Sequence, residues 1–152
     1  MKTLVIDGIF FQINEWSGIA KYWRTLLIAL DKQLANTSEF TIYLLVRGQS
    51  DSLRNLHFQS IKVLPIAFFD PICALSDFEE LGRTCKALGA DAFISSYYTL
   101  APGIANVGMA YDFIPESMGL MENHIWKLKE IYMRSLHHCL SISKSTADAA
   151  GY

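Results

Sequence analysis

The sequence predicts an α/β fold with a Rossmann-like, doubly wound and mostly parallel sheet flanked by helices. Short apolar runs, typical of buried parallel strands, alternate along the chain with longer segments of helical periodicity. Short connections join these segments, which favours a parallel sheet with crossover helices on both faces. The chain has 152 residues and no repeat or linker-like tract, so we expect a single domain over residues 1–152.

The first half of the chain carries three predicted strands and one long helix. The run "KTLVIDG" (residues 2–8) is apolar up to its closing Asp-Gly and predicts the first strand. Apolar residues then recur at helical spacing, which predicts an amphipathic helix over residues 18–35. The segments 39–48 and 61–69 are rich in β-branched, aromatic and other apolar residues and predict the next two strands.

The second half repeats the alternation. Residues 73–88 predict a helix that ends at Gly89, and an apolar stripe over residues 121–139 predicts another. Ser143 is the expected N-cap of a final helix. The remaining predicted strands are residues 91–96, 106–112 and 139–143.

Composition limits the classes of partner and compartment. A net charge of −2 gives no general attraction for nucleic acid, so no nucleic-acid partner is expected. The longest apolar runs are too short to span a bilayer, and no signal peptide is evident. Cys73, Cys85 and Cys139 lie in apolar patterns and predict reduced, buried thiols in a cytoplasmic protein.

The histidines do not suggest a metal centre. His137 and His138 adjoin one another on the predicted helix and so point in different directions. His57 and His124 have no further ligand at metal-binding spacing. We therefore expect neither a metal nor a cofactor.

In open α/β sheets, ligands bind beyond the carboxyl ends of the strands, so the loops there are the candidate sites. The first such loop leads into the 18–35 helix through Ser17, Gly18 and Ile19. Ser17 can cap the helix, and the bare backbone of Gly18 would let a phosphate approach the positive helix end. A capped helix without a ligand explains the same residues.

The second loop holds Ser96, Tyr97 and Tyr98. Adjacent tyrosines beside hydroxyls suit a sugar, because rings stack on it and hydroxyl groups bond to it. The alternative is that one or both tyrosines belong to the core.

The third and fourth loops carry charged and hydroxyl groups. Tyr111, Asp112 and Glu116 stand where an acid, base or orienting group would be needed, although solvated turn carboxylates are common. Ser143 and Lys144 open the final helix and could contact an anion or acceptor, although capping alone explains the serine.

Read in order, these segments resemble the N-terminal half of GT-B glycosyltransferases of the retaining family 4 group. The matching stretches are "LVIDG", "SGIAKYWRTLLIAL", "DAFISSYYTLAP", "GMAYDFIPE" and "LHHCLSISKSTADA", in the family's order. The resemblance implies one half of a two-domain enzyme, in which this domain holds the acceptor and a second binds the nucleotide sugar. It implies that Asp112 lines the reaction centre and that Ser17, Gly18 and Ile19 face the donor phosphates.

Two departures from the family pattern limit what carries over. Tyr111 stands where many relatives have histidine, and a phenol with a pKa of about 10 is a poor base at neutral pH. The nucleotide-sugar domain is also missing, and the last predicted helix has barely begun when the sequence stops. We therefore expect a fragment that is inactive by itself.

The leading hypothesis is the acceptor-binding domain of a hexosyltransferase. The full enzyme would move a sugar from a nucleotide sugar to a glycan or lipid-linked acceptor, with retention, in the cytoplasm. Peripheral contact with the membrane stays open, because Lys127, Lys129 and Arg134 are too few for a lipid-binding cluster and predict a solvated helix face. The alternatives are a stand-alone or dimeric binding module, which would pair through its exposed cleft face, and a nucleotide-sugar epimerase of GT-B fold.

Overall fold

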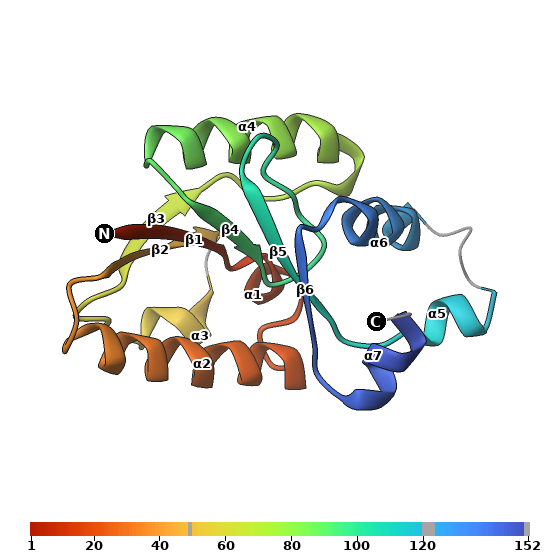
Figure 1. The fold of residues 1–152 in the computed structure, drawn as a ribbon, viewed down its shortest axis with the longest axis horizontal. Helices are drawn as coiled ribbons and strands as arrows, with labels where there is room; N and C mark the ends of the chain where they lie inside the picture. The colour runs from red at the N-terminus through yellow and green to blue at the C-terminus, as the bar shows by residue number, and fades with distance from the viewer. Residues whose placement is uncertain (49, 120–123, 151–152) are drawn as a thin grey trace.

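The computed structural model describes residues 1–48, 50–119 and 124–150. Their strands form one six-stranded sheet in the order β3-β2-β1-β4-β5-β6, and every neighbouring pair is parallel (Figure 1). This order is that of a Rossmann-like doubly wound sheet, so the predicted fold class is confirmed. The strands are β1 (Lys2–Asp7), β2 (Phe40–Arg47), β3 (Lys62–Ile66), β4 (Ala92–Ser95), β5 (Ala105–Ala110) and β6 (His138–Ser141).

The helices lie on both sides of the sheet. In Figure 1, α4 and α6 cover one face, while α2 and α3 cover the other, with α7 beyond them. The helical segments are α1 (Ile9–Asn14), α2 (Gly18–Leu34), α3 (Asp51–Arg54), the 3₁₀ turn η1 (Pro71–Cys73), α4 (Ala74–Ala87), α5 (Ile114–Ser117), α6 (His124–Ser135) and α7 (Lys144–Ala150).

All six predicted strands exist, and the helices predicted at 18–35 and 73–88 correspond to α2 and α4. The helix predicted over 121–139 is shorter, since α6 ends at Ser135; residues 120–123 lie outside the described residues. The short helix α1 was not predicted. It forms in the segment that follows β1, where the sequence suggested only a loop, and buries Ile9, Phe10 and Phe11.

Alternate residues of the strands supply two cores. Val5 and Leu45 face the α4 side, while their neighbours Ile6 and Leu44 face the α2 side. All four are at most 1% exposed, which explains why these strands read as continuous apolar runs. The larger residues of the α4 side include Phe78, Phe93, Tyr98 and Tyr132, and those of the α2 side include Phe10, Trp23 and Tyr111.

Gly108 in β5 allows α6 to approach the sheet closely. A Cβ at this position would overlap the Tyr132 hydroxyl and the Leu136 side chain. The Tyr132 hydroxyl instead accepts a hydrogen bond from the backbone N–H of Met109 at 2.9 Å. This contact fixes α6 over the carboxyl half of β5.

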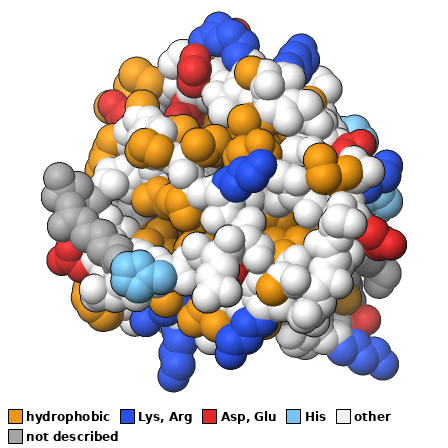
Figure 2. Space-filling model, turned by 90° about the vertical axis from the view of Figure 1, so that its left-hand side faces the viewer, with side chains coloured by type: hydrophobic (Ala, Val, Ile, Leu, Met, Phe, Trp, Pro, Cys, Tyr) orange, Lys and Arg blue, Asp and Glu red, His pale blue; other side chains and the backbone are white. Residues whose placement is uncertain are grey.

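The surface on the N-terminal side carries charges of both signs. Figure 2 shows basic and acidic side chains interspersed around this face, with hydrophobic side chains in the hollows between them. The face shown has no continuous basic patch. Within the part of the chain that the structure describes, no helix is long and apolar enough to cross a membrane.

Three sequence expectations need correction. Cys85 is buried, but Cys139 is only half-buried and Cys73 is exposed at the end of the 3₁₀ turn, although all three cysteines are free as expected. Lys129 is not part of a solvated face, because its side chain turns inward and is only 1% exposed. His137 and His138 follow α6 rather than lying on it, since the helix ends at Ser135.

Candidate functional site

The strand order of this sheet reverses between β1 and β4. These two strands are paired in parallel, from Leu4 opposite Ala92 to Asp7 opposite Ser95. Chain segments leave the sheet in opposite directions from the carboxyl ends of such a pair and open a crevice where ligands bind. Here α1 leaves from β1, and the loop holding Tyr97 and Tyr98 leaves from β4.

A buried ionic cluster, which the sequence did not reveal, lies at the carboxyl ends of β1 and β2. Arg47, at the end of β2, donates through Nε and Nη2 to the two carboxylate oxygens of Asp7, both at 2.9 Å. It also donates to the Asp77 carboxylate on α4 at 2.7 and 3.0 Å. The side chains of Asp7 and Arg47 are fully buried. One sequence pattern could have revealed the Asp7–Arg47 pair: a charged residue stands at the last position of each of two neighbouring apolar strands.

Burial and pairing shift the pKa of two groups in this cluster. Burial raises the pKa of the Asp77 carboxyl, although the hydrogen bonds and charge of Arg47 act to lower it. Burial alone would lower the pKa of Arg47, but its bonds to the two aspartates outweigh this and raise it. The cluster is therefore a fixed ionic network in which Arg47 binds both carboxylates.

The same cluster shapes the loop after β4. The Thr99 hydroxyl donates to Asp7 Oδ2 at 2.7 Å, and the Thr99 N–H donates to Ser95 Oγ at 3.1 Å. Between these anchors Tyr98 has a φ of 48°, in the left-handed region that non-glycine residues seldom adopt. The buried bonds on either side hold this strained turn, and so they determine where the tyrosine rings lie.

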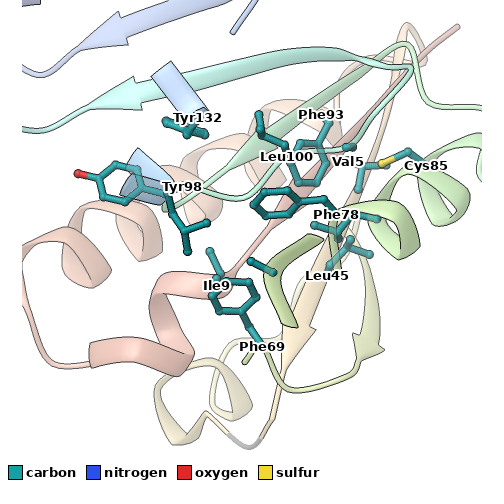
Figure 3. Packing of buried hydrophobic residues seen from close by; sticks show 14 residues of the cluster. Val5, Ile9, Leu45, Phe69, Phe78, Cys85, Phe93, Tyr98, Leu100 and Tyr132 are labelled. Carbon is teal, nitrogen blue, oxygen red and sulfur yellow. The ribbon is translucent and has the colours of Figure 1, made fainter. Parts of the chain in front are cut away.

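The two tyrosines form a stacked pair, with ring centroids 3.9 Å apart. Tyr97 also meets the ring of Phe10 edge-on, with centroids 4.9 Å apart. Tyr98 is buried at the margin of the core, and Figure 3 shows its hydroxyl pointing away from Phe78 and Phe93. The alternative considered from the sequence, that a tyrosine belongs to the core, therefore holds for the Tyr98 ring.

A cavity of about 400 Å³ opens beside these rings. We call it the apolar cavity. It lies at the strand-order reversal, between α1, the segment after β3 and the start of α6. Its lining residues are Ile9, Gln12, Ile13, Phe68, Phe69, Pro71, Tyr97, Tyr98, Trp126 and Leu128.

Ser96 and Tyr111 are joined by hydrogen bonds inside the fold. The Tyr111 hydroxyl accepts from the Trp23 indole N–H at 2.6 Å and donates to the Ser96 carbonyl at 2.7 Å. Ser96 Oγ accepts the N–H of Phe10 at 2.9 Å. Burial raises the pKa of Tyr111, so the phenolate form that could accept a proton is even scarcer at neutral pH than its residue type suggests. These bonds tie α2 to the ends of β4 and β5.

The start of α2 is capped as the sequence predicts. Ser17 Oγ accepts the N–H of Ala20 at 3.2 Å. Gly18 is exposed, and a Cβ built there would meet nothing within 4 Å. Gly18 and Ile19 border a hollow of about 520 Å³ that reaches Tyr111 and the edge strand β6. The fold itself therefore does not require glycine at position 18.

Asp112 and Glu116 lie in one segment that α6 holds in place. We call this segment, residues 112–118 with the short helix α5, the Asp112 loop. The buried Lys129 donates to the Asp112 backbone carbonyl at 2.6 Å and pairs with the Glu116 carboxylate at 2.8 Å. The Asp112 carboxylate is exposed and accepts the N–H of Ile114 at 3.2 Å. Lys129 Nζ also lies 4.6 Å from the Phe113 ring centroid and 5.9 Å from that of Tyr98. Glu116 is thus an ion-pair partner of Lys129, whereas Asp112 presents an exposed carboxylate.

The helix α7, which follows the loop after β6, is capped in the same manner as α2. Ser143 Oγ accepts the N–H of Thr146 at 3.1 Å, so the predicted N-cap is confirmed. Thr146 is buried and donates to the Tyr111 carbonyl at 3.4 Å, which brings α7 against the end of β5. Lys144 is exposed at the first position of α7.

Within the described ranges, no three His, Cys, Asp or Glu side chains gather as metal ligands would. We also compared the chain with known proteins. No protein-family model matches it, and no curated protein is significantly similar to it. The site must therefore be interpreted from its own chemistry.

Proposed function

We propose that the chain is the N-terminal, acceptor-binding domain of a GT-B glycosyltransferase, which transfers a sugar from a nucleotide sugar to a glycan or lipid-linked acceptor with retention. The observation that carries the proposal is the fixing of the Asp112 loop by buried Lys129 beside the Tyr97–Tyr98 stack. An exposed carboxylate held next to aromatic faces, at the ligand-binding edge of a Rossmann-like sheet, suits work on a sugar. The order of the motifs supports the same interpretation.

In this proposal each loop has a distinct task. Asp112 acts at the reaction centre, where a carboxylate can orient the acceptor hydroxyl or stabilise positive charge on the sugar ring. Gly18, with Ser17 and Ile19, lets the donor phosphates approach the positive end of α2. The acceptor lies along Tyr97, Tyr98, Glu116, Ser143 and Lys144. Ser96 and Tyr111, which the sequence also suggested as acceptor contacts, are buried and bonded to each other, so they support these loops from inside the fold. The second domain would supply the nucleotide site, with no metal, in a cytoplasmic enzyme.

The proposal is tested in the source cell. The gene is deleted and the cell's glycans and glycolipids are compared with those of the parent by mass spectrometry. We expect one glycan or glycolipid to disappear, to return with the wild-type gene, and not to return with Asp112→Asn. The matched control is Asp91→Asn, another exposed carboxylate, which accepts the N–H of Thr3 at 2.7 Å and lies at the amino end of β4, the end of the parallel sheet opposite the Asp112 loop. An unchanged glycan profile in the deletion strain contradicts the proposal.

The edge strand favours a second candidate, a non-catalytic module that assembles through this side. β6 is the last strand in the sheet order; Leu140 within it and Ile142 just after it are 53% and 54% exposed. Exposed apolar residues along an edge strand are typical of an assembly surface. Sedimentation equilibrium tests this candidate, which predicts a dimer that Leu140→Asp converts to a monomer. A wild-type monomer at all concentrations argues against it.

A further inference from the structure

We propose that the apolar cavity binds the hydrocarbon chain of a lipid-linked acceptor. This inference rests on the proposed function and deepens it, because it selects a lipid-linked acceptor over a purely saccharide one. A volume of about 400 Å³ is within the range of small-molecule pockets, and the cavity lies at the strand-order reversal where such pockets form.

The chemistry of the walls argues against a sugar inside the cavity. Among the residues that the structure describes, its lining contains aliphatic and aromatic side chains and no charged residue. Gln12, the one amide among these described lining residues, is already used at both ends: its Nε2 donates to the Phe69 carbonyl at 2.9 Å, and its Oε1 accepts the Phe69 N–H at 2.8 Å. A saccharide brings several hydroxyls, and each one buried without a partner costs about 1–3 kcal/mol. Sugar rings are therefore disfavoured in the part of the cavity that lies deeper than the tyrosine hydroxyls.

The same walls favour a chain of methylene or isoprenoid units. Burying apolar surface gains roughly 25 cal/mol per Å², and a flexible hydrocarbon adapts to an irregular space between rings and branched side chains. Because the described lining residues carry no charge, the phosphate and sugar of such an acceptor are expected to stay outside the cavity. The rim on the α6 side leads past the Tyr98 ring toward Lys129 and the Asp112 loop. The chain would thus anchor the acceptor while its polar end lies near Asp112.

The mouth of the cavity is apolar as well. Phe68 is 69% exposed and Ile13 is 48% exposed, from the segment after β3 and from α1 respectively. Water contact with these side chains is unfavourable, and neighbouring exposed apolar residues at a pocket rim mark a binding site. An alkyl chain entering between them would cover both.

The experiment compares two glycosides that differ only in the alkyl chain. Octyl β-D-glucoside, below its micelle concentration, and methyl β-D-glucoside are titrated into the chain labelled at its Ile and Leu methyl groups. We expect the octyl compound to shift the NMR signals of Ile9, Ile13 and Leu128 saturably, and the methyl compound to leave them unchanged. Equal shifts with both glycosides, or none with either, overturn the inference.

Two exposed positions give matched variants. Phe68→Asp puts a charge at the mouth and is expected to weaken octyl glucoside binding at least tenfold. Leu75→Asp, on the neighbouring helix α4, changes a side chain that is 72% exposed and does not line the cavity, so binding is expected to stay the same. If Phe68→Asp binds as tightly as the wild type, the cavity is not the site.

The failure of this inference can be distinguished from failure of the proposed function. If sugar transfer occurs with equal kcat/KM to methyl and octyl acceptors, the glycosyltransferase proposal stands and the cavity assignment is wrong. If octyl glucoside binds in the cavity and no glycan depends on the gene, the cavity binds hydrocarbon and the transferase proposal is wrong.

Discussion

Lys129 holds the Asp112 loop from beneath, because its buried ammonium donates to the Asp112 carbonyl at 2.6 Å and also meets the Glu116 carboxylate at 2.8 Å. One side chain of α6 therefore sets the position of the carboxylate that we place at the reaction centre. Lys129 is a positioning residue, since its contacts are with the loop itself.

Lys129→Met keeps the length of the side chain and removes its charge. We expect a loss of about 2 kcal/mol in the free energy of unfolding, because the Asp112 carbonyl and the half-buried Glu116 lose a charged donor. Hydrogen–deuterium exchange should also become faster in residues 112–118. The matched control is the exposed Lys127→Met on the same helix, for which neither change is expected. Equal behaviour of the two variants would mean that Lys129 does not position the loop.

Arg47→Met removes the cation from the buried cluster. Two carboxylates, from Asp7 and Asp77, then remain in the interior without their partner, which costs about 3–5 kcal/mol at pH 7. Urea unfolding measures this loss. The control is Arg83→Met, whose ion pair with Glu80 is largely exposed to solvent, so the urea midpoint is expected to stay nearly unchanged.

The pH dependence of this variant has a definite sign. Burial already raises the pKa of Asp77, and without the guanidinium that opposes burial the pKa rises further. A carboxyl whose pKa is higher in the folded than in the unfolded protein stabilises the fold when protonated and destabilises it when ionised. The stability deficit of Arg47→Met is therefore expected to narrow as the pH falls from 7 toward 4. A deficit that widens over this interval contradicts the assignment.

Tyr111→Phe removes one hydroxyl that serves two buried partners. The Trp23 indole N–H and the Ser96 carbonyl both lose their bond, so we expect a loss of about 1–3 kcal/mol in unfolding free energy. The near-ultraviolet circular dichroism of Trp23 should change as well. Tyr22→Phe, at a 45% exposed neighbour, serves as the control. If the two variants are equally stable, the Tyr111 hydroxyl does not link α2 to the sheet.

Gly18→Val separates folding from function at the start of α2. Because a Cβ meets nothing within 4 Å, stability should change by less than about 1 kcal/mol. In the complete enzyme, a side chain here would keep a phosphate from the helix end, so sugar transfer should fall at least tenfold. An unchanged transfer rate removes Gly18 from the donor site.

The sheet could be predicted from the sequence because its strands are buried on both faces. In runs such as that ending at Asp7, apolar residues do not alternate with polar ones. This pattern indicates strands of a parallel sheet that are buried on both faces. The helices α2 and α4 carry clear apolar stripes and end signals: Ser17 caps the first, and Gly89, with a φ of +65°, follows the second. These local signals agree with the final packing.

The interior polar contacts could not be predicted, because they depend on residues far apart in the sequence. Asp31 lies in the last turn of α2, where the sequence pattern gives it no special role. Its carboxylate nevertheless accepts the backbone N–H groups of Gln59, Ser60 and Ile61 at 2.8–2.9 Å. Nor does the sequence of α1 contain a capping signal; the helix forms because Ile9 and Phe10 join the two cores at the carboxyl end of the central strand β1. The candidate loops were found from strand ends, whereas the burial of Tyr111 and Lys129 required the structure.

The most direct test of the glycosyltransferase proposal is a transfer assay with the complete gene product. The purified protein is incubated with radiolabelled nucleotide sugars, one at a time, and with lipid and glycan extracts of the source cell. We predict that label from one nucleotide sugar moves to a lipid-extractable acceptor, and that Asp112→Asn reduces this transfer at least a hundredfold while the protein stays folded. If no nucleotide sugar gives transfer above the protein-free control, or if Asp112→Asn transfers at the wild-type rate, the proposed role of this site is contradicted.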